Sequence, residues 1–394
     1  MVNNKIKQAE ENLLPVYNRF PIVLDHGEGV YLYDTDGKEY LDFAAGFAVC
    51  GLGYGNQELN QVLKDQIDSL YHTSNLYYHE NTGEAAAALN RISGMDRIFF
   101  TNSGAEAIEG ALKAARKYAY TKKSGRYEVV AMEHSFHGRT FGAVSVTGKD
   151  AYREPFEPLV PGVRFAEFND LESVKAVVNE KTCAIILEPL QGEGGINLAT
   201  REFMEGIRKI CDEQDILMIC DEVQCGMGRT GTMFAWQGFG VKPDIMAMAK
   251  AIGNGIPVGA FAMTQKVADY SLKAGDHGST YAGNPLACAA VRKVVEIFEQ
   301  EDIVGHVNEV APYLEQRLNE IVEEFDCVTR RKGKGLMQGL ELTIPLAEVN
   351  QRAIEEGLLV IQAGGNVIRF VPPLIIEKEH VDEMIEKLKK ILNA

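Results

Sequence analysis

The chain has 394 residues, 46% of them hydrophobic and 8% aromatic, which is the composition of a globular protein long enough for two or more domains. Lys and Arg total 40 against 56 Asp and Glu, and this formal net charge of −16 argues against nucleic acid or anionic membrane surfaces as partners, because both would repel the chain at long range. The sequence also contains no apolar stretch long enough to predict a membrane span.

The N-terminal segment, residues 1–50, predicts two β-hairpins. The stretch HGEGVYLYDTDGKEYLDF has Asp36-Gly37 at a bend, which is a strong turn signal. The first twenty residues have no apolar signal core and carry Glu10 and Glu11, unlike an arginine-rich transit peptide. The seven cysteines of the chain are dispersed, with no CxxC or zinc-type spacing, which is typical of a reducing compartment. We therefore expect a cytoplasmic protein without a metal site.

From about residue 90 to 265, short apolar runs alternate with segments of helical periodicity. The runs are RIFFT, EVVAM, TCAIILE, ILMICDE, DIMAMA and GAFAM. One intervening helix is predicted in TREFMEGIRKICDEQ, with a cap-like Thr200. After residue 286, a long helix in NPLACAAVRKVVEIFEQ precedes mixed patterns. The alternation predicts an α/β fold with a mostly parallel sheet in a large domain over residues 51–285, and a smaller domain over 286–394 completed by the N-terminal segment.

Polar residues, with small and aromatic ones among them, follow five of these strands, at the edge where ligands bind in open α/β sheets. In chain order they are Asn102, Ser103, Gly104 and Ala105; His134, Phe136, His137 and Arg139; Glu188 and Glu193; Asp221 and Gln224; and Lys250. The sequence therefore predicts a polar site at one edge of the sheet.

Each of these features has two interpretations when taken alone. Lys250, between an apolar run and a glycine-rich turn, can reach solvent or pair with a carboxylate, or it can be a nucleophilic amine with a lowered pKa. Asp221 can hold a protonated ring nitrogen or cap a helix, and NSGAEA can bind a phosphate or simply cap one. His134 and His137 are more typical of hydrogen bonding or packing than of metal binding.

Taken together, the same features favour one cofactor. A lysine amine, a carboxylate one strand away, an aromatic ring at Phe136 and a phosphate-sized helix terminus suit pyridoxal 5′-phosphate (PLP). Arg139 adds a group that can clamp a carboxylate, although a solvated surface arginine is the alternative.

The sequence resembles the class III, ornithine-type aminotransferases, which have the fold-type I PLP architecture. The resemblance covers nearly the whole chain and is carried, in order, by GEGVYLYDTDGKEYLDF, TNSGAEAIEGALKAAR, HSFHGRT, EPLQGEGG, DEVQCGMGRTG, KPDIMAMAKAIGNGIPVGA, GSTYAGNP and RFVPPL. So many matches of order and spacing make the resemblance highly specific.

The resemblance implies a role for each cofactor-binding residue. Lys250 is expected to form the Schiff base with PLP and to shuttle the substrate proton, while Asp221 pairs with the pyridine nitrogen. The other expected contacts are Gln224 at the phenolic oxygen, Phe136 and Val223 on the two ring faces, and Ser103, Gly104 and Ala105 at the phosphate. Thr280 is expected to reach the phosphate of the neighbouring subunit, which implies a homodimer with shared active sites.

The resemblance also implies how substrates are recognised. Arg369 is expected to bind the α-carboxylate of 2-oxoglutarate or glutamate, and Glu193 to cover this arginine when an ω-amine donor is bound. Arg139 is expected to grip the donor's own carboxylate. One pocket would then serve both substrates of a ping-pong transamination.

The identity of the amino donor is predicted from one position at which this sequence differs from the ornithine aminotransferases. Phe47 stands where ornithine aminotransferases typically have a tyrosine that reads the free α-amino group, and this favours N-acetylornithine or 4-aminobutyrate over ornithine. The compact length and GKEYLDFAAGFAV are most similar to the acetylornithine-specific members of arginine biosynthesis. The pocket around Phe47, Tyr17 and Phe20 decides the donor.

Two other functions are considered. A PLP-fold regulatory binding protein is expected to lack at least one of four residues that are all present, namely Lys250, Asp221, Glu193 and Arg369. An aminomutase or decarboxylase needs no 2-oxoglutarate site, so the Glu193 and Arg369 pair favours the two-substrate transaminase.

Overall fold

A seven-stranded sheet forms the centre of the protein, whose computed structural model describes residues 4–393. Its strand order is β4 (Arg97–Thr101), β12 (Gly259–Met263), β11 (Ile245–Met248), β10 (Leu217–Asp221), β7 (Thr182–Leu187), β5 (Glu128–Met132) and β6 (Val163–Ala166). Strand β12 is antiparallel to both of its neighbours, and the other pairs are parallel. The α/β fold with a mostly parallel sheet is therefore confirmed.

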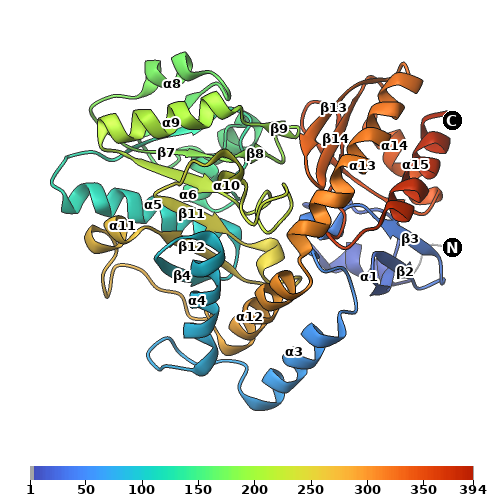
Figure 1. The fold of residues 1–394 in the computed structure, drawn as a ribbon, viewed down its shortest axis with the longest axis horizontal. Coiled ribbons are helices and arrows are strands. Elements are labelled where there is room, and N and C mark those ends of the chain that lie inside the picture. Colours follow the sequence, from blue (N-terminus) through green and yellow to red (C-terminus); the bar gives the residue numbers. More distant parts are fainter. Residues whose placement is uncertain (1–3, 394) are drawn as a thin grey trace.

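Helices cover both faces of this sheet, which is why its central strands are buried along their whole length and mostly apolar. Every residue of β7, β10, β11 and β12 is buried. Helix α5 (Gly104–Thr121) covers one face. The other face is covered by α9 (Arg201–Gln214) at one end and by α4 (Glu80–Ser93) and α12 (Pro285–Gln300) at the other. Figure 1 shows this layered body on the left.

Helix α9 illustrates how the local sequence specifies these elements. The Thr200 hydroxyl accepts a hydrogen bond from the amide of Phe203 (3.1 Å), so the predicted cap is confirmed. Phe203, Ile207 and Ile210 all point into the core, as the helical spacing predicts. Strand β6 was not among the predicted runs, because it lies at the sheet edge and only its last residue is buried.

Two smaller sheets lie beside the large one, on the right of Figure 1. The N-terminal hairpins β1 (Leu24–Glu28), β2 (Tyr31–Asp34) and β3 (Glu39–Asp42) are completed by β15 (Leu358–Leu359), which pairs parallel to β3. The second sheet is antiparallel, in the order β13 (Val328–Lys334), β14 (Met337–Leu342), β17 (Val367–Phe370) and β16 (Ile361–Ala363). The two ends of the chain thus build one smaller α/β unit, as expected, and both chain ends lie there in Figure 1.

The remaining elements connect these sheets. They are α1 (Asn4–Asn12), α2 (Ala45–Ala48), α3 (Gln57–Ser69), α6 (Phe141–Ser145), α7 (Asp150–Arg153), η1 (Glu154–Phe156), α8 (Leu171–Val177), β8 (Leu190–Gln191), β9 (Asn197–Leu198), α10 (Ala235–Phe239), η2 (Lys250–Ile252), α11 (Gln265–Tyr270), α13 (Ile303–Glu324), α14 (Leu346–Glu355) and α15 (Lys378–Asn393). None of the helices within residues 4–393 is long and apolar enough to cross a membrane. Helix α12 packs against α3 and α4. The domain boundaries at residues 50 and 285 stay predictions.

Candidate active site

The residues predicted after β4, β5, β7, β10 and β11 meet in one cavity of about 420 Å³ at the carboxyl edge of the parallel strands. The exception is His134, which is exposed and does not line the cavity. Ten of the residues predicted for the site line it: Ser103, Gly104, Ala105, Phe136, Arg139, Glu193, Asp221, Val223, Gln224 and Lys250. Arg369 lies against two of them through hydrogen bonds. Thr280 lines a different cavity of the same chain.

Lys250 stands at the point where β11 ends and η2 begins. Its backbone φ of 52° is left-handed, which is a costly conformation for a residue with a side chain. Burial and the positive charge of Arg369 lower the pKa of the Lys250 ammonium from 10.5 to about 8, while the carboxylates of Glu193 and Asp221 oppose the shift. A lysine with such a pKa is partly neutral near physiological pH, so the nucleophilic interpretation is favoured over a solvated ammonium.

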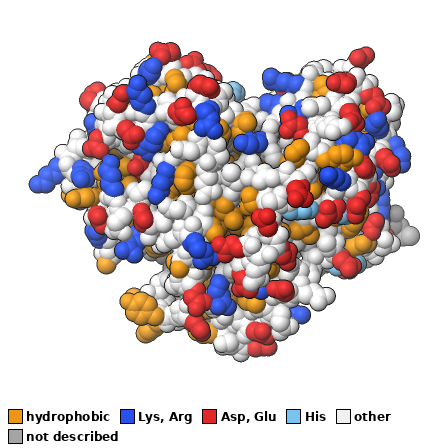
Figure 2. Space-filling model, viewed as in Figure 1, with side chains coloured by type: hydrophobic (Ala, Val, Ile, Leu, Met, Phe, Trp, Pro, Cys, Tyr) orange, Lys and Arg blue, Asp and Glu red, His pale blue; other side chains and the backbone are white. Residues whose placement is uncertain are grey.

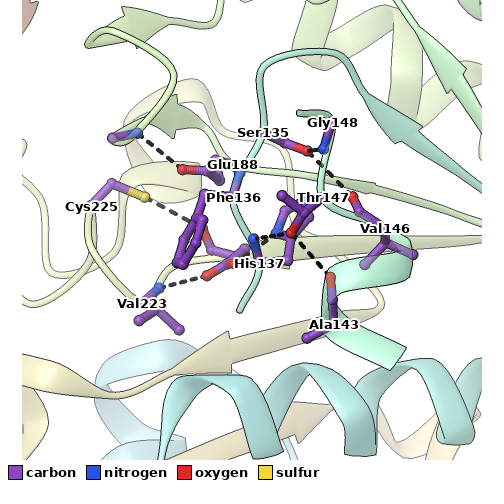
Figure 3. A network of polar contacts seen from close by, with 12 residues as sticks. Ser135, Phe136, His137, Ala143, Val146, Thr147, Gly148, Glu188, Val223 and Cys225 are labelled. Atoms are coloured by element: carbon purple, nitrogen blue, oxygen red, sulfur yellow. Dashed lines mark hydrogen bonds and ion pairs between the residues drawn. The ribbon is translucent and has the colours of Figure 1, made fainter. Parts of the chain in front are cut away.

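Asp221 is held by a buried histidine. One carboxylate oxygen of Asp221 lies 2.8 Å from Nδ1 of His137, and the other accepts a hydrogen bond from the amide of Val223 (3.0 Å). Because the carboxylate can only accept, His137 carries its proton on Nδ1. The His137 amide donates to the hydroxyl of Thr147 (3.0 Å), which fixes the turn that carries it (Figure 3). His137 is therefore a hydrogen-bonding partner.

Glu188 ties two segments of the cavity wall together. Its carboxylate accepts hydrogen bonds from the amides of Phe136 (2.8 Å) and Gly192 (3.0 Å), and Figure 3 shows it beside Phe136. Burial raises the pKa of the Glu188 carboxyl to about 7, and the nearby Asp221 charge adds to this effect. Titratable groups in different environments therefore line the cavity, and two of them, Glu188 and Lys250, have a clearly shifted pKa.

The N-terminus of α5 provides the other end of the cavity. Ser103 caps the helix, since its hydroxyl accepts from the amide of Glu106 (3.2 Å). The amides of Gly104 and Ala105 belong to the first turn and have no partner within the helix, so they are available to an anion. A Cβ on Gly104 would lie 2.9 Å from Cγ1 of Val223, and this close approach explains the glycine.

Arg369 is completely buried and faces the cavity from the smaller unit. One of its nitrogens, Nη1, donates to Glu193 (2.7 Å) and to the side-chain oxygen of Gln224 (2.8 Å), and Nη2 donates to the carbonyl of Gln362 (3.0 Å). The ring of Phe47 is centred 5.5 Å from its guanidinium carbon. A buried arginine with a single carboxylate partner is a ready binding site for the carboxylate of a ligand, provided that Glu193 moves away.

Phe47 belongs to an unusual stretch of backbone. Residues 45–48 (α2) all have left-handed dihedral angles, with φ between 45° and 67°. The buried carboxylate of Asp42 supports this turn, because it accepts hydrogen bonds from the amides of Ala44 and Ala45 (2.8 and 2.9 Å). The turn holds Phe47 beside Arg369 with half of its surface exposed.

Arg139 and Thr280 lie further out. The exposed Arg139 guanidinium lies 3.7 Å above the ring of Tyr152, at the rim of the cavity. Thr280 is exposed on a surface rich in large hydrophobic side chains, including Leu76, Tyr77, Tyr78 and Tyr281. Figure 2 shows a hydrophobic protrusion at the lower left, over the loop that joins α3 to α4.

Several residues around the cavity were not predicted individually as site residues. They are Val49, Gly255, Ile256, Pro257, Val258 and Gln362. Val49 and residues 255–258 lie within motifs that carry the family resemblance. Apolar residues, a glycine and a backbone carbonyl have no reactive group that would assign them to the site, so only the assembled fold identifies them. His137 and Asp221 both follow apolar runs, so the sequence could place them at the same sheet edge, but it could not predict their direct pairing across 84 positions.

The arrangement fits PLP. The cavity presents an amine of lowered pKa, a carboxylate held by a histidine, an aromatic ring and a helix N-terminus narrowed by Gly104. In the same order, these groups are suited to the aldehyde, the pyridine nitrogen, the flat ring and the phosphate of PLP. Fold and site together define a fold-type I PLP enzyme.

Comparison with known proteins narrows this class. Residues 15–392 match the family model described as Aminotransferase class-III. The chain is 44% identical over 390 residues to an acetylornithine aminotransferase of Methanocaldococcus jannaschii, covering 98% of each chain, and 45% identical over 381 residues to one of Aquifex aeolicus, covering 96% and 99%. An ornithine aminotransferase of Toxoplasma gondii with PLP at partial occupancy superimposes with a TM-score of 0.94 at 29% identity, covering 99% and 93%. The chain belongs to the class-III aminotransferases and is a PLP-dependent transaminase, which confirms the resemblance seen in the sequence.

Proposed function

We propose that this transaminase moves the terminal amino group of N-acetylornithine to 2-oxoglutarate, giving glutamate and N-acetylglutamate semialdehyde, a step of arginine biosynthesis. The observation that carries the proposal is the buried Arg369, paired with Glu193 and flanked by the phenyl ring of Phe47. Relatives at 44% and 45% identity over nearly the whole chain that are acetylornithine aminotransferases support it.

When bound, PLP supplies an aldehyde that takes up the donor's amino group and a ring that accepts the electron pair released at the donor carbon. Lys250 would hold the aldehyde between turnovers, and its Nζ would remove and return the proton at the reacting carbon of the substrate. Asp221 would keep a proton on the pyridine nitrogen, with His137 keeping the carboxylate oriented. The α5 amides and Ser103 would hold the phosphate. Phe136 and Val223 would cover the two faces of the cofactor ring, and Gln224 would face its phenolic oxygen.

Arg369 and Glu193 would let one pocket serve two substrates. With an ω-amine donor, Glu193 neutralises Arg369, so no unpaired buried charge remains. With 2-oxoglutarate or glutamate, the α-carboxylate replaces Glu193 and forms the bidentate pair. Arg139, at the rim, would bind the donor's own carboxylate.

Phe47 supports the choice of donor. A phenyl ring has no group that can hydrogen-bond the free α-ammonium of ornithine, and desolvating that ammonium beside the ring and Arg369 would be unfavourable. An acylated α-nitrogen carries no charge and avoids this cost.

The proposal includes a homodimer. Thr280 does not line the cavity of its own chain, and it stands on a surface with exposed Leu76, Tyr78 and Tyr281. Contiguous exposed hydrophobic side chains are typical of protein interfaces. Thr280 would then reach the phosphate site of the second subunit.

The cytoplasmic location expected from cysteine usage also stays a proposal.

The test is the visible spectrum of the holoenzyme after addition of N-acetylornithine, ornithine or 4-aminobutyrate without an oxo acid. Conversion of the cofactor to its amine form, fastest with N-acetylornithine and reversed by 2-oxoglutarate, is the expected result. Faster conversion with ornithine or 4-aminobutyrate would replace the proposed donor. No conversion with any of the three would refute the proposal.

A further inference from the structure

The loop that carries Glu193 joins the short strands β8 and β9 and lies between the large sheet and the smaller unit. We infer that Lys332, on β13 of the smaller unit, is a positioning residue for Glu193: through Asn197 it fixes the backbone of this loop, so that the Glu193 carboxylate exchanges partners by side-chain rotation alone. The inference rests on the proposed function of the Glu193 and Arg369 pair.

The side chain of Asn197 holds the loop together from within. Its amide group donates to the side-chain oxygen of Gln191 (3.1 Å) and to the carbonyl of Gly194 (3.0 Å). Gln191 is completely buried and donates in turn to the carbonyl of Glu133 (2.8 Å), at the end of β5. The loop is therefore anchored to the large sheet on one side.

Lys332 completes this network from the other side. Its ammonium donates to the side-chain oxygen of Asn197 (2.6 Å), which uses the last hydrogen-bonding group of that amide. Within residues 4–393 no carboxylate lies within ion-pair distance of Lys332. Burial and the charge of Arg330 lower the pKa of Lys332 below its ordinary value. The partly buried Lys332 ammonium makes its short, charge-assisted hydrogen bond to a neutral amide and not to a carboxylate. This choice of partner indicates that Lys332 positions Asn197.

The smaller unit also holds the loop at Glu193 itself. The amide of Gly364 donates to the backbone carbonyl of Glu193 (2.9 Å). The loop has no room to move inward, because a Cβ on Gly192 would lie 2.4 Å from the Gln224 side chain and one on Gly194 would lie 2.3 Å from the carbonyl of His134. The backbone is therefore fixed on both sides of the carboxylate.

A fixed backbone decides how Glu193 can leave Arg369. The Glu193 side chain is 26% exposed, whereas that of Arg369 is fully buried, so Glu193 has an open direction into which it can rotate. Loosening the loop would weaken the contact between Glu193 and Arg369 without obstructing the site. We therefore expect loss of Lys332 to impair the ω-amine half-reaction, which needs this contact, and to spare the glutamate half-reaction, which replaces it.

The experiment uses Lys332→Met holoenzyme, with N-acetylornithine or glutamate added alone in single-turnover measurements. We expect kcat/KM to fall about five- to tenfold for N-acetylornithine, which corresponds to the loss of one hydrogen bond of ordinary net strength, and less than about twofold for glutamate. Lys332→Arg, which keeps a donor, and Lys334→Met, two residues along the same strand face, should resemble wild type. Asn197→Ala, which removes the other end of the contact, should show the same selective loss.

A double-mutant cycle separates this role from a general structural one. If Lys332 acts through Glu193, Lys332→Met should have no further effect in a Glu193→Ala background. Amides 193–195 should also exchange with solvent faster in Lys332→Met than in Lys334→Met. Equal losses in both half-reactions, an unchanged Lys332→Met, or an effect that persists without Glu193 would overturn the inference. A wild-type protein that converts neither substrate would instead refute the proposed function.

Discussion

The reactivity of Lys250 toward an aldehyde should depend on pH in a way set by its burial and adjusted by charged neighbours, among them Arg369 and Glu193. Only the neutral amine attacks an aldehyde, so PLP uptake by the protein stripped of cofactor should follow the deprotonated fraction of Lys250. With a pKa of about 8, about a quarter of Lys250 is neutral at about pH 7.5, against about one part in a thousand for a pKa of 10.5. The cavity therefore raises the reactive fraction about 200-fold.

Substitutions of the two neighbours should move this dependence in opposite directions. Arg369 lowers the pKa of Lys250 and Glu193 raises it. Arg369→Met should therefore move the midpoint of the rate of uptake above about pH 8, and Glu193→Gln should move it below. The assay is the initial rate of the absorbance change on adding PLP, measured between about pH 6 and pH 10 within the range in which each variant stays folded. Shifts of both variants in the same direction, or a wild-type midpoint near 10.5, would refute the reasoning.

Three further outcomes are expected. Lys250→Ala should lose transamination almost completely and keep its circular dichroism spectrum, because the side chain contributes to chemistry more than to packing; near-normal turnover would contradict this. Glu193→Ala should impair the N-acetylornithine half-reaction more than the glutamate half-reaction, since Arg369 then has no carboxylate partner in the donor complex, whereas glutamate supplies one. Equal losses would argue against the exchange of partners. Phe47→Tyr should raise kcat/KM for ornithine relative to N-acetylornithine about tenfold, the value of one hydrogen bond to a charged group, and an unchanged ratio measured with both donors would show that Phe47 does not read the α-nitrogen.

Much of the fold follows from local patterns along the chain. The apolar runs of β7, β10 and β11 and the periodicity of α9 identify their elements because burial on two faces or on one stripe leaves a direct trace in the residue order. The positions of Asp221 and Lys250 follow as well, because each comes directly after such a run.

Other features depend on contacts between distant segments. Strand β12 has the same apolar character as its neighbours, and only its pairing makes it antiparallel. Arg369 meets Glu193 across 176 residues because β17 lies in the smaller unit that faces the sheet edge. Sequence similarity assigned both residues to one site, but it could not reveal that the arginine is fully buried with a single carboxylate partner.

The sequence by itself determined the elements, the carboxyl-edge location of the chemistry and the family, because these depend on periodicity and on motifs that are contiguous in the chain. Only the tertiary structure decided the pKa of Lys250, the pairing of His137 with Asp221 and the hold of Lys332 on the Glu193 loop. The physical reason is that desolvation and hydrogen-bond geometry depend on which segments are packed together, and residues far apart in the chain carry no local sign of that packing.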